Sequence, residues 1–119
     1  QRHKRAIRVA RTRRQIEAFR EVLRRELETY ADQQREAASL TPYDCGSAGS
    51  FAIPCSIVQC ESNYDWGAYN PSGAVSVYQL LGKGAPFPVT SEADKLVHHR
   101  IASDLWAGGS GASHWAQCL

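Results

Sequence analysis

The chain has 119 residues, enough for one compact domain, and its formal net charge of +2 conceals an uneven distribution of charge. Residues 1–40 hold eleven of the fourteen Lys and Arg residues against six acids, whereas residues 41–119 hold three bases against the other six acids. No run of about 18 apolar residues occurs, which excludes a predicted membrane-spanning helix. We therefore expect a basic segment at 1–40 and a folded body at 41–119.

The basic segment is predicted to form one long amphipathic helix from about residue 4 to residue 38. Its apolar residues follow one another at steps of three or four, as on one face of a helix; they are Ile16, Phe19, Leu23, Leu27 and Tyr30, called the apolar stripe below. A seven-residue repeat fails at Glu26 and Gln33, so a sustained coiled coil is not expected. We expect the apolar stripe to dock on the body, with self-association as the alternative.

The start of this helix is densely basic, with Arg2, Lys4, Arg5, Arg8, Arg11, Arg13 and Arg14. Such a run could bind nucleic acid or the anionic polymers of a cell envelope, although a solvated helical spacer is its ordinary interpretation. The residues after Gln1 are basic rather than apolar, so a signal peptide is not expected. We expect the chain to be a mature or excised part of an exported protein.

The first half of the body is predicted to be a loop followed by a short helix and a turn. Residues 39–50 are rich in Gly and Ser and indicate a linker and loop. Residues 54–60 indicate a short buried helix with Pro54 in its first turn. Residues 70–73 indicate a turn, and residues 75–81 a short strand or the start of a helix.

The second half of the body is predicted to contain a longer helix that ends near Trp106. Ser91 is its expected N-cap, with Asp94 at the capping-box position, and residues 108–111 are expected to end it. Its predicted buried face is Ala93, Leu96, Val97, Ile101 and Leu105. His98 and His99 are neighbours, and neighbours on a helix point to different faces, so we expect surface or packing histidines rather than a ligand pair.

The body contains four cysteines, which are Cys45, Cys55, Cys60 and Cys118. A body of fewer than about eighty residues seldom buries enough apolar surface to be stable without a covalent link, so we expect disulfides and an oxidising compartment. Four cysteines allow three pairings. The cysteines argue against an intracellular nucleic-acid partner. A zinc site of Cys55, Cys60, His114 and Cys118 is the weaker alternative, because the first two would turn toward different helix faces.

Glu61 is the candidate catalytic residue. It follows Ile57 and Val58 on the predicted short helix, where partial burial favours the protonated carboxyl group that a general acid needs. A solvated surface residue is the ordinary interpretation of a lone glutamate at a helix end. The nearest second acid, Asp65, is expected to cap a turn.

The residues around Glu61 form a recognisable pattern. Cys60-Glu61-Ser62 is followed by Trp66, by Asn70-Pro71-Ser72-Gly73-Ala74 and by Tyr78-Gln79-Leu80. This pattern resembles the catalytic segment of the lysozyme-like transglycosylases, especially the peptidoglycan-cleaving domains of the resuscitation-promoting-factor type. The resemblance covers about residues 52–118, including Ile101 to Trp106 and the closing Trp115-Ala116-Gln117-Cys118.

The resemblance implies a mainly α fold, a small α+β lysozyme-like domain, preceded here by the long N-terminal helix. It implies a secreted or cell-envelope bacterial enzyme that cleaves the β-1,4 bond between N-acetylmuramic acid and N-acetylglucosamine, with no cofactor or metal. Glu61 matches the single catalytic acid, and Gln79 and Tyr78 match residues that line the glycan cleft. Cys60 and Cys118 match the family's disulfide, which leaves Cys45 to pair with Cys55.

Two further residues are expected to contact the glycan, and two depart from the family pattern. Trp66, five residues after Glu61, is a predicted sugar-stacking platform with a core aromatic as the alternative, and Asn70 is a predicted substrate-binding amide. Tyr64 and Ser76 stand where the family commonly has glycine, and we expect them to add bulk at the cleft. The alternative function is therefore a peptidoglycan-binding lysozyme-like domain without turnover.

Overall fold

The computed structural model describes the backbone of residues 2–119 and the side chains of residues 11–119. Contacts divide the chain into two units, Gln1–Arg35 and Glu36–Leu119, each of which is described by itself. The boundary falls before residue 36 rather than after residue 40. An ion pair explains part of this difference, because Glu36 accepts two hydrogen bonds from Arg100, at 2.5 Å from Nε and 2.8 Å from Nη2.

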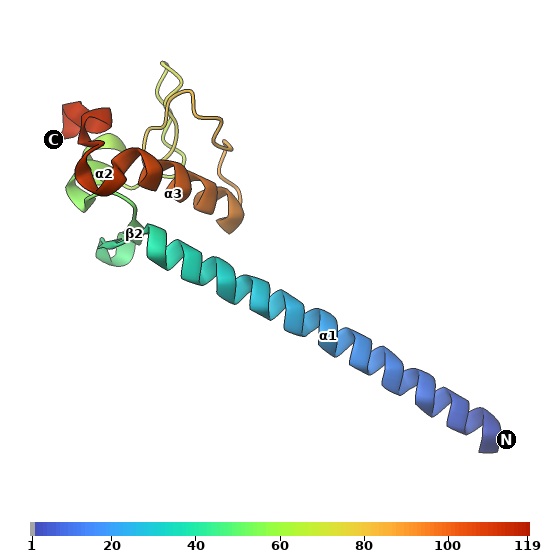
Figure 1. Ribbon diagram of the computed structural model, residues 1–119. Coiled ribbons are helices and arrows are strands. Elements are labelled where there is room, and N and C mark those ends of the chain that lie inside the picture. The colour runs from blue at the N-terminus through green and yellow to red at the C-terminus, as the bar shows by residue number, and fades with distance from the viewer. Residues whose placement is uncertain (1) are drawn as a thin grey trace. The chain divides into compact units, whose positions relative to one another are not determined.

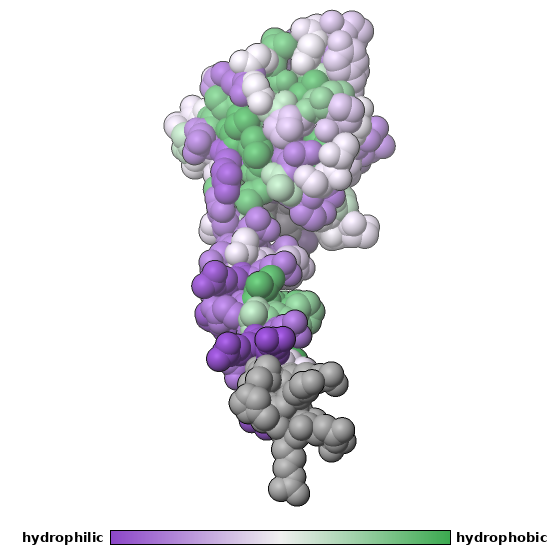
Figure 2. Space-filling view, turned by 90° about the vertical axis from the view of Figure 1, so that its right-hand side faces the viewer, coloured by the Kyte–Doolittle hydropathy of each residue, from purple (hydrophilic) through white to green (hydrophobic). Residues whose placement is uncertain are grey.

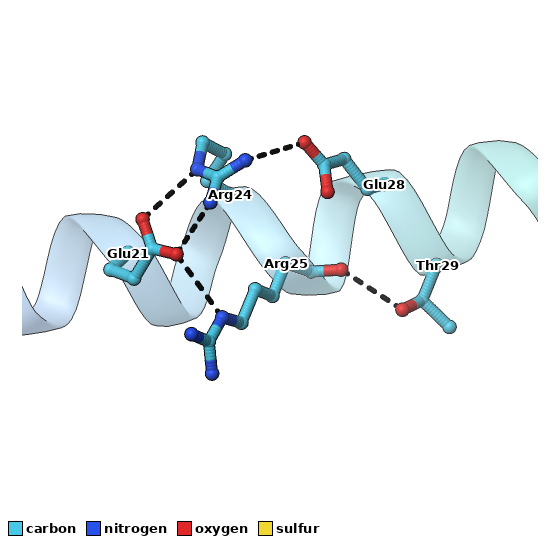
Figure 3. A network of polar contacts seen from close by, with 5 residues as sticks. All are labelled: Glu21, Arg24, Arg25, Glu28 and Thr29. Carbon is cyan, nitrogen blue, oxygen red and sulfur yellow. Dashed lines mark hydrogen bonds and ion pairs between the residues drawn. The ribbon is translucent and has the colours of Figure 1, made fainter.

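The predicted N-terminal helix is confirmed as α1, Arg2–Leu40, a single helix of 39 residues. Its sequence contains neither glycine nor proline. Ion pairs one turn apart link its polar side: Arg24 contacts Glu21 at 2.5 Å and Glu28 at 2.7 Å, and Arg25 contacts Glu21 at 3.1 Å (Figure 3). These side chains are exposed to solvent, which screens the charges, so the pairs add little to the stability of the helix.

The apolar stripe is exposed along the described part of α1. Its five side chains are between 40% and 68% exposed. Figure 2 shows apolar side chains on this helix next to strongly hydrophilic ones. The docking of the stripe on the body stays a prediction, and the predicted basic residues from Arg2 to Arg8 lie outside the described side chains. Among the described residues, no helix is long and apolar enough to cross a membrane.

The predicted loop at 39–50 is partly ordered. Helix α1 continues to Leu40, and two short strands, β1 (Tyr43–Asp44) and β2 (Ser50–Phe51), form an antiparallel pair. The 3-10 turn η1 (Gly46–Ala48) connects them. Gly49 has φ of +111°, a backbone angle that residues other than glycine rarely adopt. This conformation allows the chain to reverse over so few residues.

The predicted short helix is α2, Cys55–Ser62, with Ile57 and Val58 buried. Pro54 lies before the helix as its N-cap, with φ of −54° and ψ of 143°, so the prediction that it belongs to the first turn is wrong. Asn63 ends the helix in a left-handed conformation, with φ of 52°. Residues 63–91 then run as turns and loops to α3 (Figure 1), so neither the strand nor the helix start predicted at 75–81 forms; Val75 makes only isolated bridges to Tyr69 and Leu80.

The predicted C-terminal helix is confirmed as α3, Glu92–Trp106, but its buried face differs from the prediction. Ser91 Oγ accepts a hydrogen bond from the Asp94 backbone N–H at 3.1 Å, which confirms the N-cap. Ala93 is exposed, and Val97, Ile101 and Leu105 are only partly buried. The buried positions are Leu96, His98, His99 and Ala102. Both histidines therefore pack inside the body.

The two buried histidines are hydrogen-bonded to different partners. The Nε2 atom of His98 lies 2.7 Å from the carbonyl of Pro86, so it donates, and Nδ1 lies 2.9 Å from Ser76 Oγ. His99 Nδ1 lies 2.6 Å from the hydroxyl of Tyr78, which accepts from the Ala52 N–H at 2.8 Å. The Tyr78 hydroxyl therefore donates its own proton to a neutral His99.

Burial, together with the neighbouring His98 and Lys95, lowers the pKa of His99 to about 4. The unfolded chain binds a proton at His99 near pH 6.5, whereas the folded protein binds it only near pH 4, so stability falls as the pH drops through this window. We expect the free energy of unfolding to decrease by about 2 kcal/mol from pH 7 to pH 5. Urea denaturation at both pH values measures this. In the His99→Gln variant the free energy of unfolding should change much less between pH 7 and pH 5. If it changed as much as in the wild-type protein, the assignment to His99 would be contradicted.

Candidate active site

A cleft of about 470 Å³ lies in the body and is lined by four segments. These are the last turn of α2, the turn at 70–74, residues 79–81 and the 3-10 segment η3 (Ala112–Cys118). The lining residues are Glu61, Asn70, Ser72, Ala74, Gln79, Leu81, Ser113, His114, Trp115, Ala116 and Gln117. The cleft therefore brings together Glu61, Asn70 and Gln79, three of the five residues predicted for catalysis or substrate binding.

Glu61 is the one acid among the described residues that line the cleft. It stands on the last turn of α2, directly after Cys60, and its side chain is partly buried. This burial raises the pKa of its carboxyl group above the ordinary value. Within the described part of the chain, neither a cation nor a hydrogen-bond donor offsets the effect at this carboxyl group. A carboxyl group in such surroundings keeps its proton to higher pH, as a general acid requires.

Gln79 also lines the cleft, and its side chain is held by hydrogen bonds to the backbone. Its side-chain Nε2 donates to the backbone carbonyl of Ser76 at 2.8 Å and to that of Ala68 at 3.3 Å. Its backbone has φ of 51°, which costs a residue other than glycine about 1 kcal/mol. Because Nε2 is engaged with the backbone, the side-chain Oε1 is the atom left to accept a hydrogen bond from a ligand.

Asn70 organises the turn that forms another part of the cleft lining. Its Oδ1 accepts from the Ser72 N–H at 3.0 Å, and its backbone carbonyl accepts from the Gly73 N–H at 2.8 Å. These bonds confirm the turn predicted at 70–73. Since Oδ1 is engaged in the turn, the amide NH2 group of Asn70 is left to donate toward the cleft.

The structure does not bring Tyr78 and Trp66 into this cleft, which corrects two predictions. Tyr78 is 0% exposed, and its hydroxyl is bonded to Ala52 and His99, so its side chain cannot contact a glycan. Trp66 packs in the same aromatic core, 6.2 Å from the ring of Tyr78 and 5.3 Å from that of His99. The alternative interpretation of Trp66, a core aromatic, is the one that the packing favours.

Tyr64 and Ser76 do adopt the left-handed backbone that glycine favours, with φ of 63° and 69°. Their side chains nevertheless lie away from the cleft. The Tyr64 hydroxyl donates to the Cys55 carbonyl at 3.1 Å, and its ring packs 5.6 Å from that of Phe51. Ser76 is fully buried beside His98. The expected bulk at the cleft is therefore wrong, because both side chains are used in the core.

Asp65 caps a turn, as predicted. Its Oδ1 accepts from the Gly67 N–H at 2.8 Å, and the side chain is exposed. Asp65 does not line the cleft with Glu61. The cleft accordingly offers one carboxyl group together with side-chain amides, hydroxyls, the imidazole of His114 and apolar side chains.

All four cysteines are paired, Cys45 with Cys55 and Cys60 with Cys118. These are the pairs that the resemblance implies, and the alternative zinc site is contradicted because its cysteines are already bonded. Cys60 precedes Glu61 and Cys118 follows Gln117, so the second disulfide joins two chain segments that both line the cleft. Its Cα atoms lie 5.7 Å apart.

Five residues of η3 line the cleft, although none of them was predicted to bind the glycan; they are Ser113, His114, Trp115, Ala116 and Gln117. Trp115 is 3% exposed, and its indole N–H donates to the backbone carbonyl of Tyr78 at 2.9 Å. This bond fixes η3 against the segment that carries Gln79. The predicted link of Cys118 to Cys60 is the signal that could have placed these residues near Glu61.

Comparison with protein-family models, with curated proteins and with solved structures found no match for this chain. The described chain is mainly helical, with the long α1 and one small two-stranded sheet, which is the coarse fold expected from the sequence.

The two disulfides are expected to differ in what they hold together. Replacing either pair by serines should destabilise the protein. The expected loss is about 4 kcal/mol for Cys60–Cys118, with a sequence separation of 58, and about 3 kcal/mol for Cys45–Cys55, with a separation of 10. Only the Cys60→Ser/Cys118→Ser protein should alter the cleft, which NMR detects as shifts of the Gln79 and Gln117 side-chain amides below the melting temperature. The Cys45→Ser/Cys55→Ser protein is the matched control. Equal shifts in both proteins would contradict a separate role in the cleft.

Proposed function

We propose that the body is a lysozyme-like glycosidase that cleaves the β-1,4 bond between N-acetylmuramic acid and N-acetylglucosamine in peptidoglycan. The observation that carries this proposal is the single carboxyl group of Glu61, with a raised pKa, in a cleft that also contains the amides of Asn70 and Gln79. Amide and hydroxyl groups suit the hydroxyl and N-acetyl groups of a sugar chain. The pattern of residues from Cys60 to Leu80 supports the same assignment by resemblance.

Glu61 would act first as the acid and then as the base. Its carboxyl group donates a proton to the glycosidic oxygen as the bond from that oxygen to the anomeric carbon breaks. The resulting carboxylate accepts a proton from the hydroxyl group that attacks the anomeric carbon, which belongs either to the substrate itself or to water. A substrate that supplies its own nucleophile explains why one carboxyl group would suffice where most glycosidases use two.

Amides fixed by the backbone would position the sugars. Gln79 would accept a hydrogen bond through Oε1, and Asn70 would donate through its NH2 group, because the other polar atoms of each side chain are engaged within the protein. A hydroxyl or N-acetyl group offers the complementary partners. The alternative of glycan binding without turnover depended on bulk from Tyr64 and Ser76 at the cleft, and neither residue lines it: Tyr64 packs against the core, and Ser76 is buried.

A location outside the cytoplasm, in the bacterial cell envelope or beyond it, belongs to this proposal. Two disulfides in a body of this size support an oxidising compartment. Peptidoglycan lies in such a compartment. The proposed partner is accordingly the glycan strand, with no metal or cofactor needed for the step at Glu61.

The Glu61→Gln protein should keep its fold but lose at least about 100-fold in turnover, because the amide matches the carboxyl group in shape and cannot donate the acid proton. Release of soluble muropeptides from purified cell walls, analysed by mass spectrometry, measures the rate. The same analysis distinguishes hydrolysis from formation of an anhydro sugar. Asp104→Asn, which neutralises an exposed acid on α3, is the control and should retain full activity. Equal rates for wild type and Glu61→Gln would remove Glu61 from the mechanism.

A truncated protein that begins at Glu36 should remain folded and cleave glycan. This start keeps the ion pair between Glu36 and Arg100. If the apolar stripe docks on the body, its five side chains contribute about 8–15 kcal/mol before ordering costs, and truncation should lower the melting temperature. Light scattering of both proteins tests the alternative. A concentration-dependent dimer that truncation abolishes, with an unchanged melting temperature, would show that the helix serves self-association instead.

A further inference from the structure

A second hollow of about 270 Å³ adjoins the cleft, and we call it the side pocket. Gln79, Leu81, His114 and Trp115 line both hollows, so the two share a wall. Beyond this wall the side pocket is lined by residues that the cleft lacks, among them Lys83 and Leu105. A ligand bound in the cleft therefore has a second space next to it that differs in chemistry.

Lys83 gives the side pocket its charge. The body from residue 41 onward contains three basic residues, and two of them are engaged within the protein. Arg100 pairs with Glu36, while Lys95 contacts Glu92 at 3.4 Å and lies 5.4 Å from the ring centre of Trp66. In the part of the chain that the structure describes, Lys83 has neither an ion pair nor a hydrogen bond, and it lies between two glycines with φ of +66° and +69°.

The two hollows thus differ in the ionisable groups that line them. Glu61 belongs to the cleft alone, and Lys83 belongs to the side pocket alone. A neutral sugar can accept only a hydrogen bond from Lys83, whereas an anionic group is also attracted to its charge and would be repelled by an ionised Glu61. The remaining walls of the side pocket include the apolar side chains of Leu81, Leu105 and Trp115. A ligand that complements this pocket has an aliphatic part and a carboxylate.

We infer that the side pocket binds a carboxylate of the peptide that is attached to the glycan strand in the cleft. This inference rests on the proposed function and narrows its substrate to strands that carry peptides. A peptide joined to the sugar is the one occupant that is aliphatic, anionic and held next to the cleft by covalent attachment. The attachment also makes binding intramolecular, so a single exposed charge pair is enough to select the substituted sugar.

The test uses soluble, uncross-linked glycan strands in two forms. One form carries its native peptides, and in the other the peptide amino groups are acetylated and the carboxylates are converted to methylamides. Wild type should have a KM about threefold to fivefold lower for the native form, as one exposed charge pair provides, with kcat unchanged. The Lys83→Gln protein should show the higher KM for both forms. Lys95→Gln, which removes a lysine outside both hollows, should behave as wild type.

Binding to the Glu61→Gln protein, measured by calorimetry, gives a readout that does not require turnover. We expect the Glu61→Gln protein to bind the methylamide form more weakly than the native form, and the Glu61→Gln/Lys83→Gln protein to bind both forms equally. This result would support the side pocket even if the wild-type protein cleaves neither form and the proposed function fails. Equal binding of the two forms, or a preference that persists without Lys83, overturns the inference while leaving glycan cleavage untouched. Tighter Lys83-dependent binding of a phosphodiester wall polymer than of the native strands also overturns it, because the anion recognised would then be a phosphate.

Discussion

The architecture of the cleft depends on the buried side chain and backbone of Tyr78. Its hydroxyl accepts from the Ala52 N–H after β2 and donates to His99 on α3, and its carbonyl accepts the indole N–H of Trp115 in η3. Each of these polar groups is buried, so leaving any of them unpaired would cost about 1–3 kcal/mol. One residue therefore links three elements to the segment that continues into Gln79, and two of the linked parts, that segment and η3, line the cleft.

Left-handed backbone conformations determine where the cleft residues lie. Asn63 and Tyr64 turn the chain directly after the helix that carries Glu61, and Ser76 and Gln79 turn it again in the segment that carries the amide. Such conformations are unfavourable for residues with a β-carbon, and they persist where the surrounding contacts compensate for them. Here the compensation comes from side-chain hydrogen bonds of Tyr64, Ser76 and Gln79. The turns are thereby fixed without the freedom that glycine would bring.

Regular elements were predictable from the sequence because their signals are local. Helix α1 follows from apolar spacing, and the start of α3 follows from the Ser91 cap, whereas the direction of a side chain in residues 63–91 follows from no periodicity. Tyr78 and Gln79 were both predicted to line the cleft, but only Gln79 does, whereas Tyr78 is buried in the core. The positive φ at Gln79 contributes to this difference, and no sequence period predicts it. The buried face of α3 was missed for a related reason, since two histidines appear polar in a sequence but are hydrogen-bonded inside the body.

The charged side chains of the body separate into those that stabilise the fold and those that remain available. Asp44, Asp65 and Asp94 accept backbone N–H groups at turns and at a helix start, and Arg100 and Lys95 have partners within the protein. Glu61 and Lys83 line the two adjoining hollows, and within the described residues neither has such a partner. A partly buried carboxyl group without a partner reduces stability when it is ionised, since no contact offsets its lost hydration. The placement of Glu61 therefore does not stabilise the fold. It is explained if the protonated form of Glu61 acts on a ligand.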